Sequence, residues 1–112
     1  MDESTKQEIN FIREALLLLQ QESNWTKEGE FDDKCEQVIG PYSLSCALKV
    51  AQNKIKGKFE SRSKAMNKLR IIIYSDFFCR AKHHPIYYFN KHSKTKHSEI
   101  ILVLQKTIKK LV

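Results

Sequence analysis

The residues best suited to chemistry in this chain lie close together in its second half, as one thiol and four imidazoles. They are Cys79, His83, His84, His92 and His97. Thiolate and imidazole bind zinc, but two ligands on one helix need a spacing of about four, and His92 and His97 are five apart. No second cysteine lies nearby. We therefore expect no metal and no cofactor, and interpret the histidines as solvated or capping side chains.

Nucleophilic catalysis is the second chemistry that these residue types allow. Cys35 or Cys79 could attack a substrate with a histidine as base, but such a site also needs an orienting group and an oxyanion hole. No signature of a thiol enzyme surrounds either cysteine. The chain has only Gly29, Gly40 and Gly57, too few for a phosphate-binding glycine loop. We expect a protein that is not an enzyme, without catalytic residues.

The cysteines also indicate a compartment. Cys35, Cys46 and Cys79 form no C-x-x-C pair, and their odd number would leave one thiol unpaired in any disulfide scheme. This favours a reducing compartment, so we expect three free thiols. Cys46, within the run L-S-C-A-L, is interpreted as a small buried hydrophobic residue.

Charge is divided unequally along the 112 residues. Residues 1–36 hold ten acidic and four basic side chains, a net −6, whereas residues 37–112 hold sixteen basic and three acidic ones, a net +13. A basic surface accelerates association with nucleic acid, anionic lipid or an acidic protein alike. Nucleic-acid binding is the alternative function, with Lys54, Lys56, Lys58, Arg62 and Lys64 as phosphate contacts. These charges spread over two helices and a loop rather than one recognition helix, which counts against it.

Apolar periodicity indicates how these residues are positioned. Residues three or four apart predict four helices, over residues 5–22, from Pro41 or Ser43 to Gly57, from Ser61 or Ser63 to Phe77, and from Thr95 to Leu111. The run at 71–74 also suits a strand, because its β-branched residues favour that state, but we favour helix. Residues 86–90, I-Y-Y-F-N, are predicted to be extended.

This pattern predicts an all-α fold. We expect a small four-helix bundle with long connecting loops, formed as a single helical domain by residues 1–112. The first and last helices carry apolar residues on more than one face, and this surplus predicts a homodimer. The apolar runs are far shorter than the ~20 residues that cross a bilayer, and the acidic start is unlike a signal peptide, so we expect no membrane contact.

Five segments carry a family resemblance. They are F-I-R-E-A-L-L-L-L, N-W-T-K-E-G, S-L-S-C-A-L-K-V-A, I-Y-Y-F-N-K and T-K-H-S-E-I-I-L-V-L-Q-K-T-I. Their order resembles an uncharacterised family of small helical bacterial and phage proteins, with a tryptophan and a glycine after helix one, a cysteine-leucine-glycine-alanine-leucine helix and a tryptophan-asparagine pair before the last helix. Phe89-Asn90 stands in place of that pair. The resemblance implies the all-α fold and no known activity.

The composition points toward a regulatory role. Its Lys, Ile and Asn content is similar to that of small regulators from intracellular bacterial pathogens, some of which inhibit a secreted effector enzyme. Because the chain lacks catalytic motifs, and because its acidic aromatic loop and its basic half present two differently charged surfaces, we predict a protein-binding regulator, an inhibitor that docks on a partner enzyme such as a bacterial effector. Its expected location is the bacterial cytoplasm, or the host cytosol if it is secreted.

Aromatic side chains with charged rims are typical of interaction hot spots. The predicted partner contacts are Trp25, Phe31, Asp32, Asp33, Tyr87 and Tyr88. Asp32 and Asp33 are expected to steer a basic partner. Large aromatics are highly buried on average, so the alternative that Trp25 and Phe31 only seal the core beneath their loop stays open.

Overall fold

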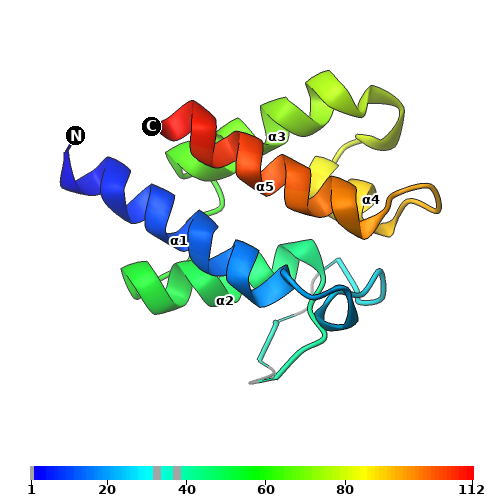
Figure 1. The fold of residues 1–112 in the computed structure, drawn as a ribbon, viewed down its shortest axis with the longest axis horizontal. Helices are drawn as coiled ribbons and strands as arrows, with labels where there is room; N and C mark the ends of the chain where they lie inside the picture. The colour runs from blue at the N-terminus through cyan, green and yellow to red at the C-terminus, as the bar shows by residue number, and fades with distance from the viewer. Residues whose placement is uncertain (1, 32–33, 37–38) are drawn as a thin grey trace.

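The computed structural model describes residues 2–31, 34–36 and 39–112, and these fold into helices (Figure 1). The α-helices are α1 (Glu3–Leu19), α2 (Leu44–Lys56), α3 (Lys64–Asp76), α4 (Pro85–Lys91) and α5 (His97–Leu111), with 3-10 turns at Glu22–Asn24 and Phe78–Arg80. The predicted all-α class is confirmed. Within these residues, no helix combines the length and the hydropathy that a bilayer crossing requires.

Polar side chains fix where three of the helices begin. Asp2, Ser43 and Ser63 each accept a hydrogen bond from the backbone N–H three residues further on, which satisfies a donor that has no partner within the helix. The predicted starts of α2 and α3 are thereby confirmed, whereas α1 begins earlier than predicted. α2 ends at Gly57, whose φ of 78° is a left-handed conformation that favours glycine.

The predicted extended segment at residues 86–90 is wrong, since it lies within α4. Pro85 occupies the first turn, where its missing N–H needs no partner. Phe89 and Asn90 follow Ile86 by three and four residues, and all three are buried, which is helical periodicity. The described residues therefore contain five α-helices instead of the four predicted, and the four-helix bundle is not confirmed.

Residues 71–74 belong to α3, as we favoured. α5 begins at His97 rather than at Thr95, because Thr95 is buried and the backbone N–H of Lys96 donates to the Glu99 carboxylate at 2.8 Å. This bond closes the first turn of α5 from within.

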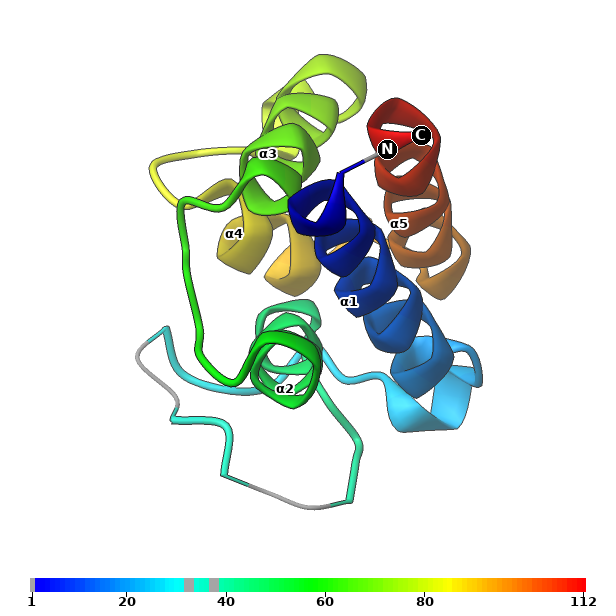
Figure 2. The ribbon, with the colours of Figure 1, turned by 90° about the vertical axis from the view of Figure 1, so that its left-hand side faces the viewer.

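α1 is the central helix of the fold. Figure 2 looks along the bundle and shows α1 between α2, α3 and α5. Its Phe11 and Ile12 are fully buried in one continuous apolar core. The wide apolar faces of α1 and α5 are therefore mostly covered within one chain, although Leu17 and Leu102 remain 63% and 41% exposed.

A charged group also lies in this core. The Glu8 side chain is 2% exposed; its Oε2 accepts a hydrogen bond from Lys56 Nζ at 2.7 Å, and its Oε1 accepts one from the backbone N–H of Ala65 at 2.7 Å. Lys56 also pairs with Glu60. Glu8 therefore joins α1 to the end of α2 and the start of α3.

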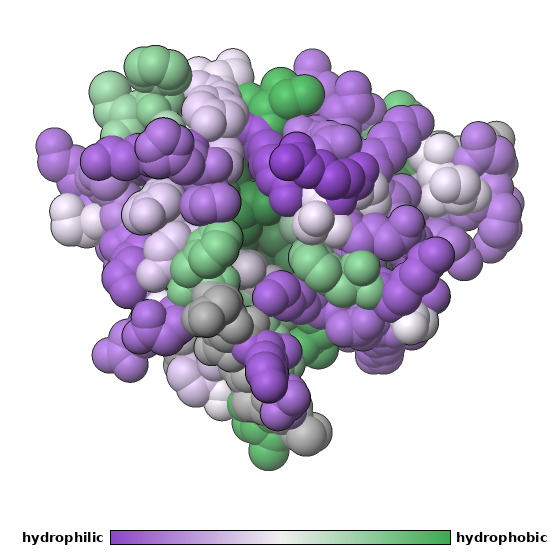
Figure 3. Space-filling model, turned by 180° about the vertical axis from the view of Figure 1, so that it is seen from behind, coloured by the Kyte–Doolittle hydropathy of each residue, from purple (hydrophilic) through white to green (hydrophobic). Residues whose placement is uncertain are grey.

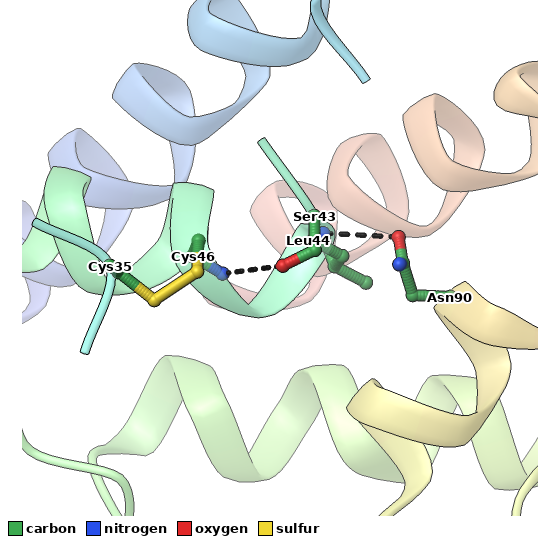
Figure 4. Close-up of a disulfide and its surroundings, with 5 residues drawn as sticks. All are labelled: Cys35, Ser43, Leu44, Cys46 and Asn90. Carbon is green, nitrogen blue, oxygen red and sulfur yellow. Dashed lines mark hydrogen bonds between the residues drawn. A yellow bond between two sulfur atoms is a disulfide. The ribbon is translucent and has the colours of Figure 1, made fainter. Parts of the chain in front are cut away.

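The free-thiol prediction is wrong for two of the three cysteines. Cys35 and Cys46 form a disulfide with a Cα–Cα distance of 5.1 Å, which joins the long loop to α2 (Figure 4). Cys79 alone is free, and it is exposed. Cys46 is buried as predicted, but as half of a disulfide. Counting cysteines missed this pairing because the loop folds back onto the start of α2.

Candidate functional site

The side chain of Trp25, a predicted partner contact, is hydrogen-bonded to a buried residue of this protein. Its half-buried indole donates from Nε1 to Asn90 Oδ1 at 2.6 Å, and its ring lies 5.9 Å from that of His97. Asn90 Oδ1 also accepts from the backbone N–H of Leu44 at 3.0 Å (Figure 4), and its Nδ2 donates to the Thr26 carbonyl at 3.1 Å. These bonds favour the interpretation that Trp25 seals the core, and its partner contact stays a prediction.

The other predicted aromatic residues do come together. The ring of Phe31 lies 5.4 Å from that of Tyr87 and 4.1 Å from that of His84, and Tyr87 lies 5.1 Å from Tyr88. We call Phe31, His84, Tyr87 and Tyr88 the aromatic cluster. It joins the loop after α1 to α4, so Phe31 of the predicted contacts lies beside Tyr87 and Tyr88, whereas Trp25 does not belong to this cluster. Asp32 and Asp33 lie outside the described residues.

A groove of about 730 Å³ opens beside the aromatic cluster, a volume within the range of ligand-binding sites. Figure 3 shows this face, with hydrophobic residues in and beside a central hollow and hydrophilic residues above it. The groove runs between α2, α3 and α4. Its helical lining residues are Ser45, Lys49, Met66, Arg70, Tyr74, Pro85, Ile86 and Tyr87.

Loop residues complete the groove. Phe31, Phe59, Ser61, Arg62, His83 and His84 line it from the connecting segments. The lining therefore combines aromatic rings and Met66 with several cations. Among the described residues, no aspartate or glutamate lines it.

The two arginines of the groove reinforce one another's positive field. Arg70 donates to Asn67 Oδ1 at 3.1 Å, and neither Arg62 nor Arg70 has an ion pair with a carboxylate in the described part of the chain. Burial, and then the nearby charge of Arg62, lower the pKa of Arg70 below its usual value. Arg62 and Arg70 therefore place two neighbouring positive charges in the groove.

The basic residues predicted to contact nucleic acid have different environments. Lys54 pairs with Glu14 at 3.1 Å, and Lys56 is held by Glu8 and Glu60. Of the five predicted residues, only Arg62 lines the groove; Lys58 and Lys64 are exposed elsewhere. Two of the five predicted phosphate contacts, Lys54 and Lys56, thus lie in ion pairs within the protein.

The histidines have separate environments. His97 Nε2 lies 2.6 Å from the Leu19 carbonyl, His92 Nδ1 accepts from the backbone N–H of Lys94, and His84 belongs to the aromatic cluster. In the described ranges, no three residues of metal-binding type are grouped to hold an ion. The local contacts of His92 and His97 agree with their interpretation as capping side chains.

Sequence reasoning missed Arg70, Tyr74 and Phe59 as site residues. Met66, Arg70 and Tyr74 are four residues apart on α3, so one face of this helix presents all three to the groove. That spacing was visible in the sequence. The approach of α2 and α4 to this face was not, because α4 was predicted to be extended.

The comparisons with known proteins identify a family but no activity. A family model described as a family of unknown function, DUF6197, matches residues 3–110. The chain therefore belongs to this family, which confirms that it resembles an uncharacterised one. The motifs and the bacterial or phage origin that we associated with that family stay predictions. No curated protein and no solved structure matches the chain significantly.

Proposed function

We propose that this protein is a non-enzymatic regulator that binds another protein, and that it inhibits a partner enzyme by docking through the groove and the aromatic cluster. The observation that carries the proposal is the composition of this surface. Tyrosine, phenylalanine, methionine and arginine, enriched in the cores of protein interfaces, line it together. Phe31 is 51% exposed and Tyr88 39% exposed, so both are available for contact.

The test is affinity capture from the native cell, followed by mass spectrometry and an activity assay of the captured enzyme. We expect a stoichiometric partner that is retained by the wild type and lost with Phe31→Ala or Tyr87→Ala, because these truncations remove hot-spot rings. Phe78→Ala is the matched control, since Phe78 is 72% exposed and does not line the groove. Recovery of the same proteins with every variant would refute the proposal.

Nucleic-acid binding is the second candidate. It is favoured by Arg62 and Arg70, which have no described carboxylate partner and lie in the same groove as rings that could stack on bases. Its signature is an affinity that falls steeply with salt, because bound phosphates release counterions. Sub-micromolar binding of single-stranded DNA or RNA at physiological salt, without a stoichiometric protein partner, would favour it over the regulator.

A homodimer and a cytoplasmic location belong to the same proposal. The argument for a homodimer rests on the exposed side chains of Leu17 in α1 and Leu102 in α5, since most of the other apolar surface of these two helices is buried within the chain. Light scattering at micromolar concentration tests it, and a monodisperse monomer would exclude it. The cysteines no longer support a cytoplasmic location, because the Cys35–Cys46 disulfide is typical of oxidising compartments.

A further inference from the structure

The charge of the groove identifies the kind of partner that fits it. Several basic side chains elsewhere in the protein are neutralised: Lys54 by Glu14, Lys56 by Glu8 and Glu60, Arg80 by Glu99, and Lys106 by Asp76. Arg62 and Arg70 lie in a groove whose described lining contains no carboxylate. An arginine fork binds a carboxylate through two parallel hydrogen bonds, so this pair is suited to acidic side chains.

The floor of the groove sets a second requirement. Met66 and Ile86 are 3% and 7% exposed and form part of an apolar lining, and the rings of Phe31 and Tyr87 stand beside it. A purely ionic ligand would leave this apolar lining in contact with water. A ligand that has an apolar side chain next to acidic groups would satisfy both the floor and the arginines.

We propose that the groove binds a short acidic segment of the partner protein, with an aromatic or aliphatic side chain on the Met66–Ile86 floor and carboxylates at Arg62 and Arg70. This rests on the proposed function and differs from the sequence-based expectation of a basic partner. A peptide fits better than a nucleic acid, because neither Lys54 nor Lys56 lines the groove and Lys56 is held by Glu8 and Glu60, so few of the predicted phosphate contacts are available beside Arg62.

The test measures the binding of defined probes to the full chain by fluorescence anisotropy. The first probe is a labelled nine-residue peptide with a central phenylalanine flanked by glutamates. The second has glutamine at every glutamate position, and the third is a labelled ten-nucleotide oligothymidylate. We expect the glutamate peptide to bind at least ~10-fold more tightly than either of the others, the difference of roughly one well-formed charged contact.

Variants locate the site of binding. Arg62→Ala with Arg70→Ala should weaken the glutamate peptide at least ~10-fold, whereas Lys58→Ala with Lys64→Ala removes the same charge outside the groove and should change its affinity less than ~2-fold. Circular dichroism melts check that both pairs fold. Equal binding of the glutamate and glutamine peptides, or equal losses with both variant pairs, would overturn the inference. Tighter binding of the oligothymidylate would assign the groove to nucleic acid instead.

The inference and the proposed function fail in distinguishable ways. If a captured partner is lost with Phe31→Ala but retained with the double arginine variant, the regulator stands and the acidic segment is wrong. If the glutamate peptide binds as expected but no captured partner depends on Phe31 or Tyr87, the groove chemistry stands and the regulator is wrong.

Discussion

Asn90 illustrates, at the scale of single residues, how one side chain positions a loop. It is 3% exposed, and its amide holds the Trp25 indole, the first backbone N–H of α2 and the Thr26 carbonyl. Through these bonds it connects α4 to both ends of the loop that carries Phe31. An amide is the side chain that offers an acceptor and donors in one planar group, which a carboxylate or an aliphatic residue cannot do.

Replacement of Asn90 by alanine should destabilise the protein by about 3 kcal/mol, because the buried N–H of Leu44, the half-buried Trp25 indole and the Thr26 carbonyl all lose their partner. Urea denaturation monitored by circular dichroism measures this difference. Asn53→Ala, at an exposed position of α2, is the matched control and should change stability by less than about 0.5 kcal/mol. Comparable values for both variants would show that the Asn90 bonds contribute little.

Glu8 and Glu14 provide a second comparison, because both are α1 glutamates paired with α2 lysines. Glu8→Gln should cost about 3 kcal/mol, since it leaves the nearly buried Lys56 ammonium with Glu60 alone. Glu14→Gln should cost at most about 1 kcal/mol, because the Lys54 side chain is 65% exposed and water screens the pair. Chemical denaturation of both variants gives the two values, and the reverse order would contradict this assignment.

Sequence reasoning at this scale succeeded where a residue acts locally. The cap Ser43 and the stop Gly57 were predicted because each acts within a few residues of its own helix end. Asn90 and Glu8 were missed because their partners lie on other helices, and Arg70 because the groove that it lines forms only where α2, α3 and α4 meet. A polar residue that caps a distant helix has no signature in its own neighbourhood.

At the scale of elements, the loop between α1 and α2 is attached to the rest of the fold by a covalent bond as well as by backbone hydrogen bonds. The disulfide joins Cys35 to Cys46, eleven residues apart, while the backbone of Thr26 and Asn24 pairs with Tyr42. Phe31 lies between these two attachments. The loop therefore presents one wall of the groove from a restrained position.

Removal of this disulfide should lower the free energy of unfolding by about 3 kcal/mol, the chain-entropy value for a closed loop of this length. The variant is Cys35→Ser with Cys46→Ser, and Cys79→Ser is the control that leaves the disulfide intact. Melting with and without dithiothreitol measures the effect, and reductant should shift the wild type but not the double variant. Three reactive thiols in the oxidised, denatured wild type would show that the disulfide does not form.

The helix α4 explains why the architecture was only partly predictable. The periodicity of α1, α2, α3 and α5 is long enough to be read from sequence, whereas α4 has seven residues, too few for the pattern to repeat. Its helical state depends on packing against α3 and α2. The same packing forms the groove, so the element hardest to predict is the one that completes the candidate site.

For the whole molecule, the net charge of +7 must be reconciled with a folded chain. The carboxylates of Glu60 and Glu99, which this net value already counts, lie in ion pairs with Lys56 and Arg80 and so lower the repulsion between basic groups locally. The hydrogen bond and charge of Lys56 lower the pKa of Glu60. Burial raises the pKa of Glu99, but hydrogen bonds from Lys96 and Arg80 outweigh it, so the pKa falls below its usual value.

These shifts predict that stability falls in acid. A carboxylate with a lowered pKa in the folded state contributes stability above its unfolded value of about 4.5, and this contribution is lost as pH falls through the folded pKa. Protonation also raises the positive charge and its self-repulsion. Urea unfolding between pH 3 and pH 7 should therefore show a decline below about pH 4.5, which is reduced in Arg80→Ala.

At high pH, stability depends on a basic group, Lys56, whose pKa shifts upward rather than downward. Burial lowers the pKa of Lys56, but hydrogen bonds to Glu8 and Glu60 outweigh it and raise the pKa above its usual value of 10.5. A raised pKa contributes stability that is fully present below 10.5 and is lost as pH rises through the folded value. Unfolding measured from pH 8 to pH 11.5 should decline only near the upper end, and less in Lys56→Met than in the wild type. A decline that begins near pH 9 and is equal in both proteins would show that other groups set the basic limit.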